Sequence, residues 1–348
     1  VVMAGGQADA VALAEYLGAP VACSYLHNDA FPADHELWVG PIGYQGHKTA
    51  MNLISQADVV LALGSRLGPF GTLPQHGLEY WPEDARIVQV DTDHRALGLV
   101  RDVEVAVCGD AGAASREILD RLKNLEVTAH ASRDTRLAEL AAQREAWESE
   151  LTEWSSADGS PVAPRRALRE LERAMPTDAV VSSDIGNICS VSNSYLRFAR
   201  PTSFLAAMSF GNCGYAFPTA MGAKVAAPDR PVVAYVGDGA WGMSLAEMMT
   251  CVRENIPVVA VVFNNGQWGA EKKNQVEFYD NRYVGTNLAN PSFAEVARSM
   301  GGNGLTVDAP DQVGDGLREA LGSNRPTVLE VMCTTELGDP FRLSLIHI

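Results

Sequence analysis

The sequence predicts an α/β protein with two doubly wound parallel-sheet domains joined by a helical linker. Three observations lead to this fold class. The chain has 348 residues, which is long for one domain and usual for two. Short, nearly continuous apolar runs alternate with helical patterns, as they do in parallel sheets covered by helices on both faces. The composition also changes between residues 124 and 166, which indicates a domain boundary.

The strands have the clearest pattern. Each is short, rich in β-branched residues and bounded by Gly, Pro or Asp, which is typical of buried parallel strands. We expect strands at residues 58–63, 87–91, 179–184, 232–236, 258–263 and 327–332. Between them, the pattern predicts helices such as 48–56, 218–226 and 245–253.

The region between the two sets of strands has a composition of its own. Residues 131–154 are rich in Ala, Glu and Arg, and residues 155–164 form a cluster of turn residues. We interpret this region as a connecting helix and linker. The predicted organisation is a first domain at 1–125, a helical linker at 126–160 and a second domain at 161–340. The tail at 343–348 (LSLIHI) matches no element pattern, and whether it is native sequence stays open.

Charge and composition exclude several classes of function. The chain has 27 Lys and Arg against 43 Asp and Glu, a formal net charge of −16, so we expect no nucleic-acid or anionic-membrane partner. No apolar run approaches the roughly 18 residues of a membrane span. The six cysteines form no CxxC pair, which argues against a disulfide framework or a zinc site and favours a cytoplasmic location.

The strongest chemical signal lies at the ends of two predicted strands. Gly237, Asp238 and Gly239 end one strand, and Asn265 follows the next strand, 27 residues after Asp238. Ligands bind at the carboxyl ends of strands in open α/β sheets, and glycines let the backbone approach an anion. A carboxylate, an amide oxygen and a main-chain carbonyl suit Mg²⁺, which would take its remaining ligands from water and a diphosphate.

The same tripeptide occurs a second time at Gly314, Asp315 and Gly316. No apolar strand precedes this copy, and Arg342 stands 27 residues beyond Asp315. We therefore interpret the second copy as the start of a helix and the first as a functional site.

The first copy, followed after 24 residues by Asn264 and Asn265, resembles the signature of thiamin-diphosphate enzymes such as acetohydroxyacid synthase and pyruvate decarboxylase. The resemblance implies that Asp238, the Asn265 side chain and the Gln267 carbonyl hold the metal. It also implies that the backbone amides of Gly239 and Ala240 meet the diphosphate.

Two further segments match cofactor-binding parts of that family. Residues 184–188 match a segment whose backbone closes over the diphosphate, and residues 211–215 match a segment that carries an apolar residue under the bent cofactor. That apolar residue is Cys213 here, where relatives often have Met, Leu or Ile. Besides those above, the implied cofactor-binding residues are Ile185, Gly186, Asn187, Ile188, Cys213, Gly214, Tyr215 and Gly237.

Other stretches resemble one group within the family, the sulfoacetaldehyde acetyltransferases, and the resemblance covers essentially residues 1–340. These stretches are 43–46, 67–76, 194–198, 240–244 and 267–275. The resemblance implies that sulfoacetaldehyde and phosphate become acetyl phosphate and sulfite, with thiamin diphosphate as the electron sink. Residues 1–125 resemble the central domain of the family. We expect no FAD there, because no GxGxxG follows a strand.

Sulfonate and phosphate are anions, so the pocket needs cations despite the net negative charge. Lys272 and Lys273 are candidates because they follow Asn265, and Arg197 is a further candidate. The alternative for the lysines is a solvated pair on a helix. His47 and His76 could transfer protons, although a lone His is more often a packed or surface residue.

The family places another domain before the central one, with the Glu that activates the cofactor. From the start at Val1 we expect that domain to be missing, so no residue here takes that role. Active sites of the family lie between subunits. The resemblance therefore implies a homo-oligomer, a dimer or tetramer, for the full-length protein and negligible turnover by this chain alone.

Three alternatives stay open. Another member of the family, of the acetolactate synthase or oxalyl-CoA decarboxylase type, would share the cofactor and release no sulfite. A nicotinamide-dependent oxidoreductase would need a phosphate-binding fingerprint that the sequence lacks. A catalytically inactive binding subunit would have no need of the Asp238 and Asn265 pair.

Overall fold

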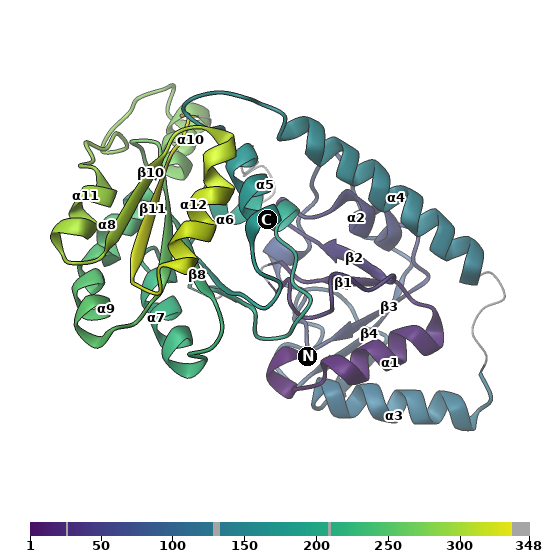
Figure 1. Cartoon of the computed structure of the whole chain (residues 1–348). Helices are drawn as coiled ribbons and strands as arrows, with labels where there is room; N and C mark the ends of the chain where they lie inside the picture. The colour runs from purple at the N-terminus through teal and green to yellow at the C-terminus, as the bar shows by residue number, and fades with distance from the viewer. Residues whose placement is uncertain (26, 128–132, 208–209, 336–348) are drawn as a thin grey trace. The chain divides into compact units, whose positions relative to one another are not determined.

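The structure is a computed structural model that describes residues 1–25, 27–127, 133–207 and 210–335 (Figure 1). The chain divides into two compact units. The first is Val1–Glu153 with Leu196–Phe204, and the second is Trp154–Tyr195 with Leu205–Ile348. These units differ from the predicted boundaries because the helix predicted as a linker belongs almost entirely to the first unit. The tail at 343–348 lies outside the described residues.

The first unit contains two small parallel sheets. One pairs β1 (Val21–Cys23) with β2 (Trp38–Pro41), and the other places β4 (Arg86–Asp91) between β3 (Val59–Leu63) and β5 (Val105–Cys108). The strands predicted at 58–63 and 87–91 are confirmed to within one residue. The helical elements are η1 (Val2–Ala4), α1 (Gln7–Leu17), α2 (Lys48–Ile54), η2 (Pro69–Gly71), α3 (Ala111–Asn124) and α4 (Arg133–Trp154).

Helix α4 is the element that was expected to be a linker. Leu140, Trp147 and Leu151 on it are buried, and Leu137 packs partly buried against a second core cluster. Charged residues and alanines make up most of the rest, so its sequence shows no wide apolar face. Leu140 packs with Val39 and Ala50 in a core cluster of the first unit. This narrow apolar stripe explains why the helix belongs to the first unit.

The second unit is built on a six-stranded sheet in the order β10-β11-β9-β8-β6-β7 (Figure 1). The pairs from β10 to β6 are all parallel. The strands are β6 (Val180–Ser183), β7 (Phe204–Ala206), β8 (Val232–Gly237), β9 (Val259–Asn264), β10 (Asn303–Val307) and β11 (Thr327–Met332). The four strands predicted here are confirmed, and β7 and β10 at the two edges are additional.

Helices cover both faces of this sheet, as predicted for a doubly wound fold (Figure 1). Alternate strand residues such as Ala234, Val236 and Val262 pack with Phe217 and Trp241 in one large core cluster. The helical elements are α5 (Pro164–Ala174), α6 (Asn187–Tyr195), α7 (Ala216–Ala226), α8 (Asp238–Ser244), η3 (Leu245–Glu247), α9 (Met248–Glu254), α10 (Gly269–Phe278), α11 (Phe293–Ser299) and α12 (Pro310–Gly322).

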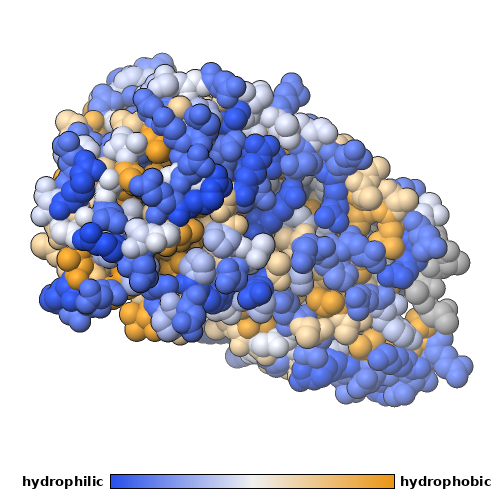
Figure 2. Space-filling view, in the orientation of Figure 1, coloured by the Kyte–Doolittle hydropathy of each residue, from blue (hydrophilic) through white to orange (hydrophobic). Residues whose placement is uncertain are grey.

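The visible surface is largely polar. The face shown in Figure 2 is mostly hydrophilic, with smaller apolar patches between the polar residues. Among the described residues, no helix is both long and apolar enough to cross a membrane. The six cysteines are all free thiols.

Candidate functional site

The candidate site lies at the carboxyl edge of the six-stranded sheet. After β6 the chain runs to β7 at one edge and then returns to β8 on the other side of β6. This reversal creates a topological switch point, where open α/β sheets form a crevice for ligands. A pocket occupies this position, and its lining includes residues that follow β6, β8 and β9.

Four helices begin at this pocket. The first residues of α5, α6, α8 and α10 all line it, among them Pro164, Asn187, Gly239 and Gly269. The amino end of a helix carries a partial positive charge and backbone N–H groups without partners inside the helix. Several such ends around one pocket favour a strongly anionic ligand, such as a phosphate or diphosphate.

Two carboxylates, Asp238 and Glu271, are among the described residues that line the pocket. Asp238 is 3% exposed. Its Oδ1 accepts a hydrogen bond from Gly239 N at 2.9 Å. Its Oδ2 accepts three, from Asn265 N at 3.2 Å, Gly266 N at 2.7 Å and Asn290 Nδ2 at 2.8 Å. Burial raises the pKa of this carboxyl group, and these hydrogen bonds oppose the shift. Each carboxylate oxygen has about two lone pairs, so Oδ1 retains acceptor capacity.

The predicted metal ligands lie together around the pocket. Asp238, Asn265 and Gln267 all line it, and Gln267 N donates to Asn265 Oδ1 at 3.2 Å. The described residues contain no cluster of three or more His, Cys, Asp or Glu side chains that could hold a metal. The candidate set has a different composition, with one carboxylate, one amide oxygen and one main-chain carbonyl. Such an oxygen set could hold Mg²⁺ when a phosphate group supplies further oxygens.

Asp184 connects the two other predicted cofactor segments. Its carboxylate accepts hydrogen bonds from Ile185 N at 2.9 Å, Gly214 N at 3.1 Å and Ala216 N at 2.9 Å. It therefore ties the start of segment 185–188 to segment 211–215. Burial of Asp184 raises its pKa, and the backbone hydrogen bonds oppose the rise.

Most of the predicted cofactor residues line the same pocket. These are Ile185, Gly186, Asn187, Ile188, Cys213, Gly237, Asp238, Gly239, Ala240, Asn265 and Gln267. Gly214 and Tyr215 stand beside Cys213 in the chain and are not among the lining residues. Burial raises the pKa of the Cys213 thiol to about 11, which keeps it neutral at physiological pH.

The three predicted substrate cations each contact another polar side chain in this structure. Lys272 Nζ donates to Asn287 Oδ1 at 2.9 Å, and Lys273 pairs with Glu277 at 3.5 Å. Arg197 belongs to the first unit and pairs there with Glu148. None of the three is among the residues that line the pocket.

Arg165 is one of the pocket residues that sequence reasoning missed. Among the described residues that line the pocket it is the only Lys or Arg. Its guanidinium lies 5.1 Å from the centre of the Trp154 ring, and it also contacts the Tyr195 hydroxyl. The available signal was its position directly after Pro164, because proline is common at the first position of a helix.

The two histidines considered for proton transfer both belong to the first unit. His76 Nε2 lies 3.0 Å from the Gly46 carbonyl oxygen, and both His47 and His76 pack against the Trp147 ring. They are packed side chains, as the alternative interpretation expected. The second Gly-Asp-Gly copy lies within helix α12 (Pro310–Gly322) and not at its start as expected, and Asp315 pairs there with Arg318.

Comparison with known proteins adds to this geometry. Residues 1–122 match the family described as thiamine pyrophosphate enzyme, central domain, and residues 184–331 match thiamine pyrophosphate enzyme, C-terminal TPP binding domain. The sulfoacetaldehyde acetyltransferase of Castellaniella defragrans is 58% identical over 98% of this chain. That of Alcaligenes xylosoxydans xylosoxydans is 54% identical, also over 98%. The acetolactate synthase large subunit of Corynebacterium glutamicum is 30% identical over 95%. The chain spans 60% of the length of the two acetyltransferases and 53% of the synthase.

Proposed function

The chain belongs to the thiamine pyrophosphate enzymes, and we propose that it forms the central and diphosphate-binding parts of a sulfoacetaldehyde acetyltransferase. The proposed reaction converts sulfoacetaldehyde and phosphate to acetyl phosphate and sulfite. The observation that carries the proposal is the pocket in which Asp238, Asn265 and Gln267 meet four helix amino ends. The identity of 58% and 54% to two acetyltransferases supports the substrate.

The residues present fit thiamin diphosphate with Mg²⁺. Asp238 Oδ1, the Asn265 side-chain oxygen and the Gln267 carbonyl would bind the metal. The amides of Gly239 and Ala240 at the start of α8 would bind the diphosphate, as helix amino ends do. When bound, the cofactor supplies the electron sink for the reaction at the substrate carbonyl.

Other residues of the pocket would orient the cofactor and the substrate. Cys213 stays a neutral thiol and would pack as a small apolar residue against the cofactor. Asp184 holds the segments on either side of it in place through its three backbone hydrogen bonds.

We assign the anion-binding role to Arg165 ahead of Lys272, Lys273 and Arg197. Its position in the pocket lining supports this choice, since the other three contact groups outside that lining. A guanidinium presents several N–H donors in a plane, and phosphate and sulfonate oxygens both accept such bonds. Arg165 would bind the substrate sulfonate or the attacking phosphate.

The remaining proposals concern the whole protein. We propose a central domain at 1–125 and a cofactor domain at 161–340, which the matched families support. Residues 126–160 would connect them, with α4 packed on the first unit. A homo-oligomer, dimer or tetramer, and a cytoplasmic location are proposed on the family resemblance and the free cysteines.

The decisive experiment follows the products. The gene product that carries this chain is supplied with thiamin diphosphate, Mg²⁺, phosphate and sulfoacetaldehyde, then with pyruvate or oxalyl-CoA in place of the aldehyde. We expect sulfite and acetyl phosphate in equal amounts from sulfoacetaldehyde, both dependent on the cofactor. Turnover of pyruvate or oxalyl-CoA with no sulfite from sulfoacetaldehyde would contradict the proposed substrate and favour the other members of the family.

A further inference from the structure

Glu330 is a buried carboxylate that no step of the proposed reaction uses. It lies in the middle of β11 and is 1% exposed. Burying a charge is costly unless hydrogen bonds satisfy it. Such a residue inside an otherwise apolar strand therefore needs an explanation from its contacts.

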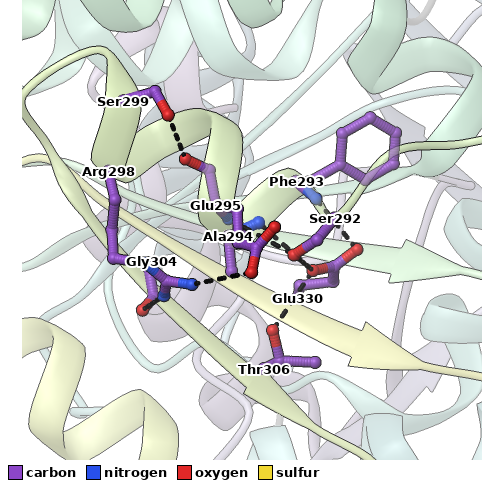
Figure 3. Close-up of polar contacts among 9 residues, drawn as sticks. All are labelled: Ser292, Phe293, Ala294, Glu295, Arg298, Ser299, Gly304, Thr306 and Glu330. Carbon is purple, nitrogen blue, oxygen red and sulfur yellow. Dashed lines mark hydrogen bonds and ion pairs between the residues drawn. The ribbon is translucent and has the colours of Figure 1, made fainter.

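Five donor groups surround the Glu330 carboxylate, and none of them is a cation. Oε1 accepts from Asn264 Nδ2 at 2.9 Å and from Phe293 N at 3.1 Å. Oε2 accepts from Ser292 Oγ at 3.1 Å, Ala294 N at 3.1 Å and Thr306 Oγ1 at 3.2 Å. Figure 3 shows the four contacts from residues 292–294 and 306 converging on Glu330. An ionised carboxylate is an acceptor only, which matches this set of donors.

The bond from Asn264 to Glu330 fixes the orientation of the Asn264 amide. Because an ionised carboxylate cannot donate, the Asn264 nitrogen must face Glu330 and the Asn264 oxygen must face the other way. That oxygen accepts from Asn290 Nδ2 at 2.9 Å. The direction of the first hydrogen bond therefore determines the direction of the second.

The same Asn290 nitrogen reaches the predicted metal ligand. It donates to Asp238 Oδ2 at 2.8 Å as well as to Asn264 Oδ1. A side-chain amide has two N–H donors, so both of them are used in these two bonds. Glu330, Asn264, Asn290 and Asp238 thus form a continuous chain of hydrogen bonds, which we call the Glu330 relay.

We propose that Glu330 is a positioning residue for the metal site and acts through this relay. Glu330 orients Asn264, and Asn264 in turn orients Asn290 so that its NH₂ group donates to Asp238 Oδ2. The other carboxylate oxygen, Oδ1, then remains available to bind Mg²⁺. This inference rests on the proposed cofactor and does not depend on the substrate. Outer partners of metal ligands typically change metal affinity about 10–100-fold when they are removed.

The Glu330→Gln variant tests the relay. Its side-chain NH₂ group can face the NH₂ group of Asn264, and two donors cannot form a hydrogen bond with each other. The matched control is Thr306→Val, which removes another Glu330 contact and lies outside the path to Asp238. Binding of Mn²⁺ to the gene product that carries this chain, with thiamin diphosphate present, is measured by electron paramagnetic resonance. Thermal unfolding without metal is measured alongside it. We expect E330Q to lower Mn²⁺ affinity about tenfold or more, and T306V to lower only the unfolding temperature.

Two further variants test the relay if E330Q does not fold. Asn290→Ala changes a half-buried residue and removes the last donor of the relay to Asp238, and Asn264→Ala interrupts it nearer to Glu330. Both are expected to lower Mn²⁺ affinity about tenfold. The E330Q and N290A effects should also be less than additive in the double variant, because they break one chain.

The outcomes separate this inference from the proposed reaction. Wild-type Mn²⁺ affinity in E330Q, or in N264A where E330Q does not fold, overturns the inference and leaves the substrate proposal intact. Tight Mn²⁺ binding without sulfite release contradicts the substrate and leaves the relay intact. A wild-type gene product carrying this chain that binds no Mn²⁺ with thiamin diphosphate contradicts the cofactor proposal and this inference with it.

Discussion

The carboxylate of Asp184 accepts a hydrogen bond from the backbone amide of Ala216, with 2.9 Å between Oδ2 and the nitrogen. Ala216 begins α7, and Asp184 follows β6. The bond therefore joins two segments that both border the candidate site. Together with the bond from Gly214 N, it ties the loop that carries Cys213 to the edge of the sheet.

We predict that Asp184→Asn weakens both folding and cofactor binding. The two carboxylate oxygens accept hydrogen bonds from three backbone N–H groups. In asparagine an NH₂ group replaces one of these oxygens and cannot accept, so at least one backbone N–H loses its partner. One buried N–H left unpaired costs about 1–3 kcal/mol in the free energy of unfolding. Urea unfolding at pH 7 and thiamin diphosphate titration measure the two effects.

The second Gly-Asp-Gly copy offers a matched control for this variant. The Asp315 side chain is 78% exposed, so Asp315→Asn should change stability by no more than about 0.5 kcal/mol. Equal losses in D184N and D315N would contradict the structural role of Asp184.

The sequence predicts the central strands well because burial on both faces leaves a continuous apolar run. Strands β8, β9 and β11 lie within one residue of their predicted bounds. The edge strand β10 was missed because its residues are half-exposed and mixed in polarity. Strand context also separated the two Gly-Asp-Gly copies, of which one follows β8 and the other lies in α12.

The contacts between distant residues could not be predicted from local pattern. Asn290 reaches Asp238 across 52 positions, and Asn264 reaches Glu330 across 66. Nothing in the local sequence of Glu330 indicates which donors the fold will bring to it. The same reason explains Arg165, whose place in the pocket depends on how α5 packs rather than on a motif.

We predict that Gly239→Ala destabilises the chain through a steric clash. A Cβ atom at Gly239 would lie 2.7 Å from ring atoms of Trp268, so the indole would have to move. Such overpacking typically costs about 1–3 kcal/mol in the free energy of unfolding. The control is Gly237→Ala, because a Cβ atom there meets nothing within 4 Å. Chemical denaturation of both variants measures the difference, and equal stability of the two would contradict the clash.

We predict that alkylation of Cys213 rises with pH until about pH 11. Burial raises the pKa of this thiol to about 11, and only the thiolate reacts. The rate with iodoacetamide should therefore increase about tenfold per pH unit below that value. The exposed Cys108 is first replaced by Ser so that its reaction does not interfere.

The same experiment with cofactor tests the place of Cys213 in the pocket. Thiamin diphosphate with Mg²⁺ should slow the alkylation, because Cys213 lines the pocket together with Asp238. Alkylation that levels off near the ordinary thiol pKa of 9.0 would contradict the effect of burial. An unchanged rate with cofactor would contradict the proposed position of the ligand.

Arg165→Gln is predicted to raise the KM for phosphate or for sulfoacetaldehyde. A hydrogen bond to a charged group contributes about 1.5–3 kcal/mol, which corresponds to roughly a tenfold to hundredfold change in binding. Arg165→Lys keeps the charge and loses the planar set of donors, so it should recover part of the affinity. Steady-state kinetics on the gene product that carries this chain, with each substrate varied in turn, shows which anion Arg165 binds.

The three other cations provide the comparison for Arg165. Lys272, Lys273 and Arg197 contact Asn287, Glu277 and Glu148 in this structure, so replacing each with Gln should leave both KM values unchanged. Unfolding temperatures of all four variants are needed, because Arg165 also packs on Trp154 and its loss removes that contact. If K272Q or K273Q raises a KM and R165Q does not, the anion is bound by the lysines that follow Asn265, and the assignment to Arg165 is wrong.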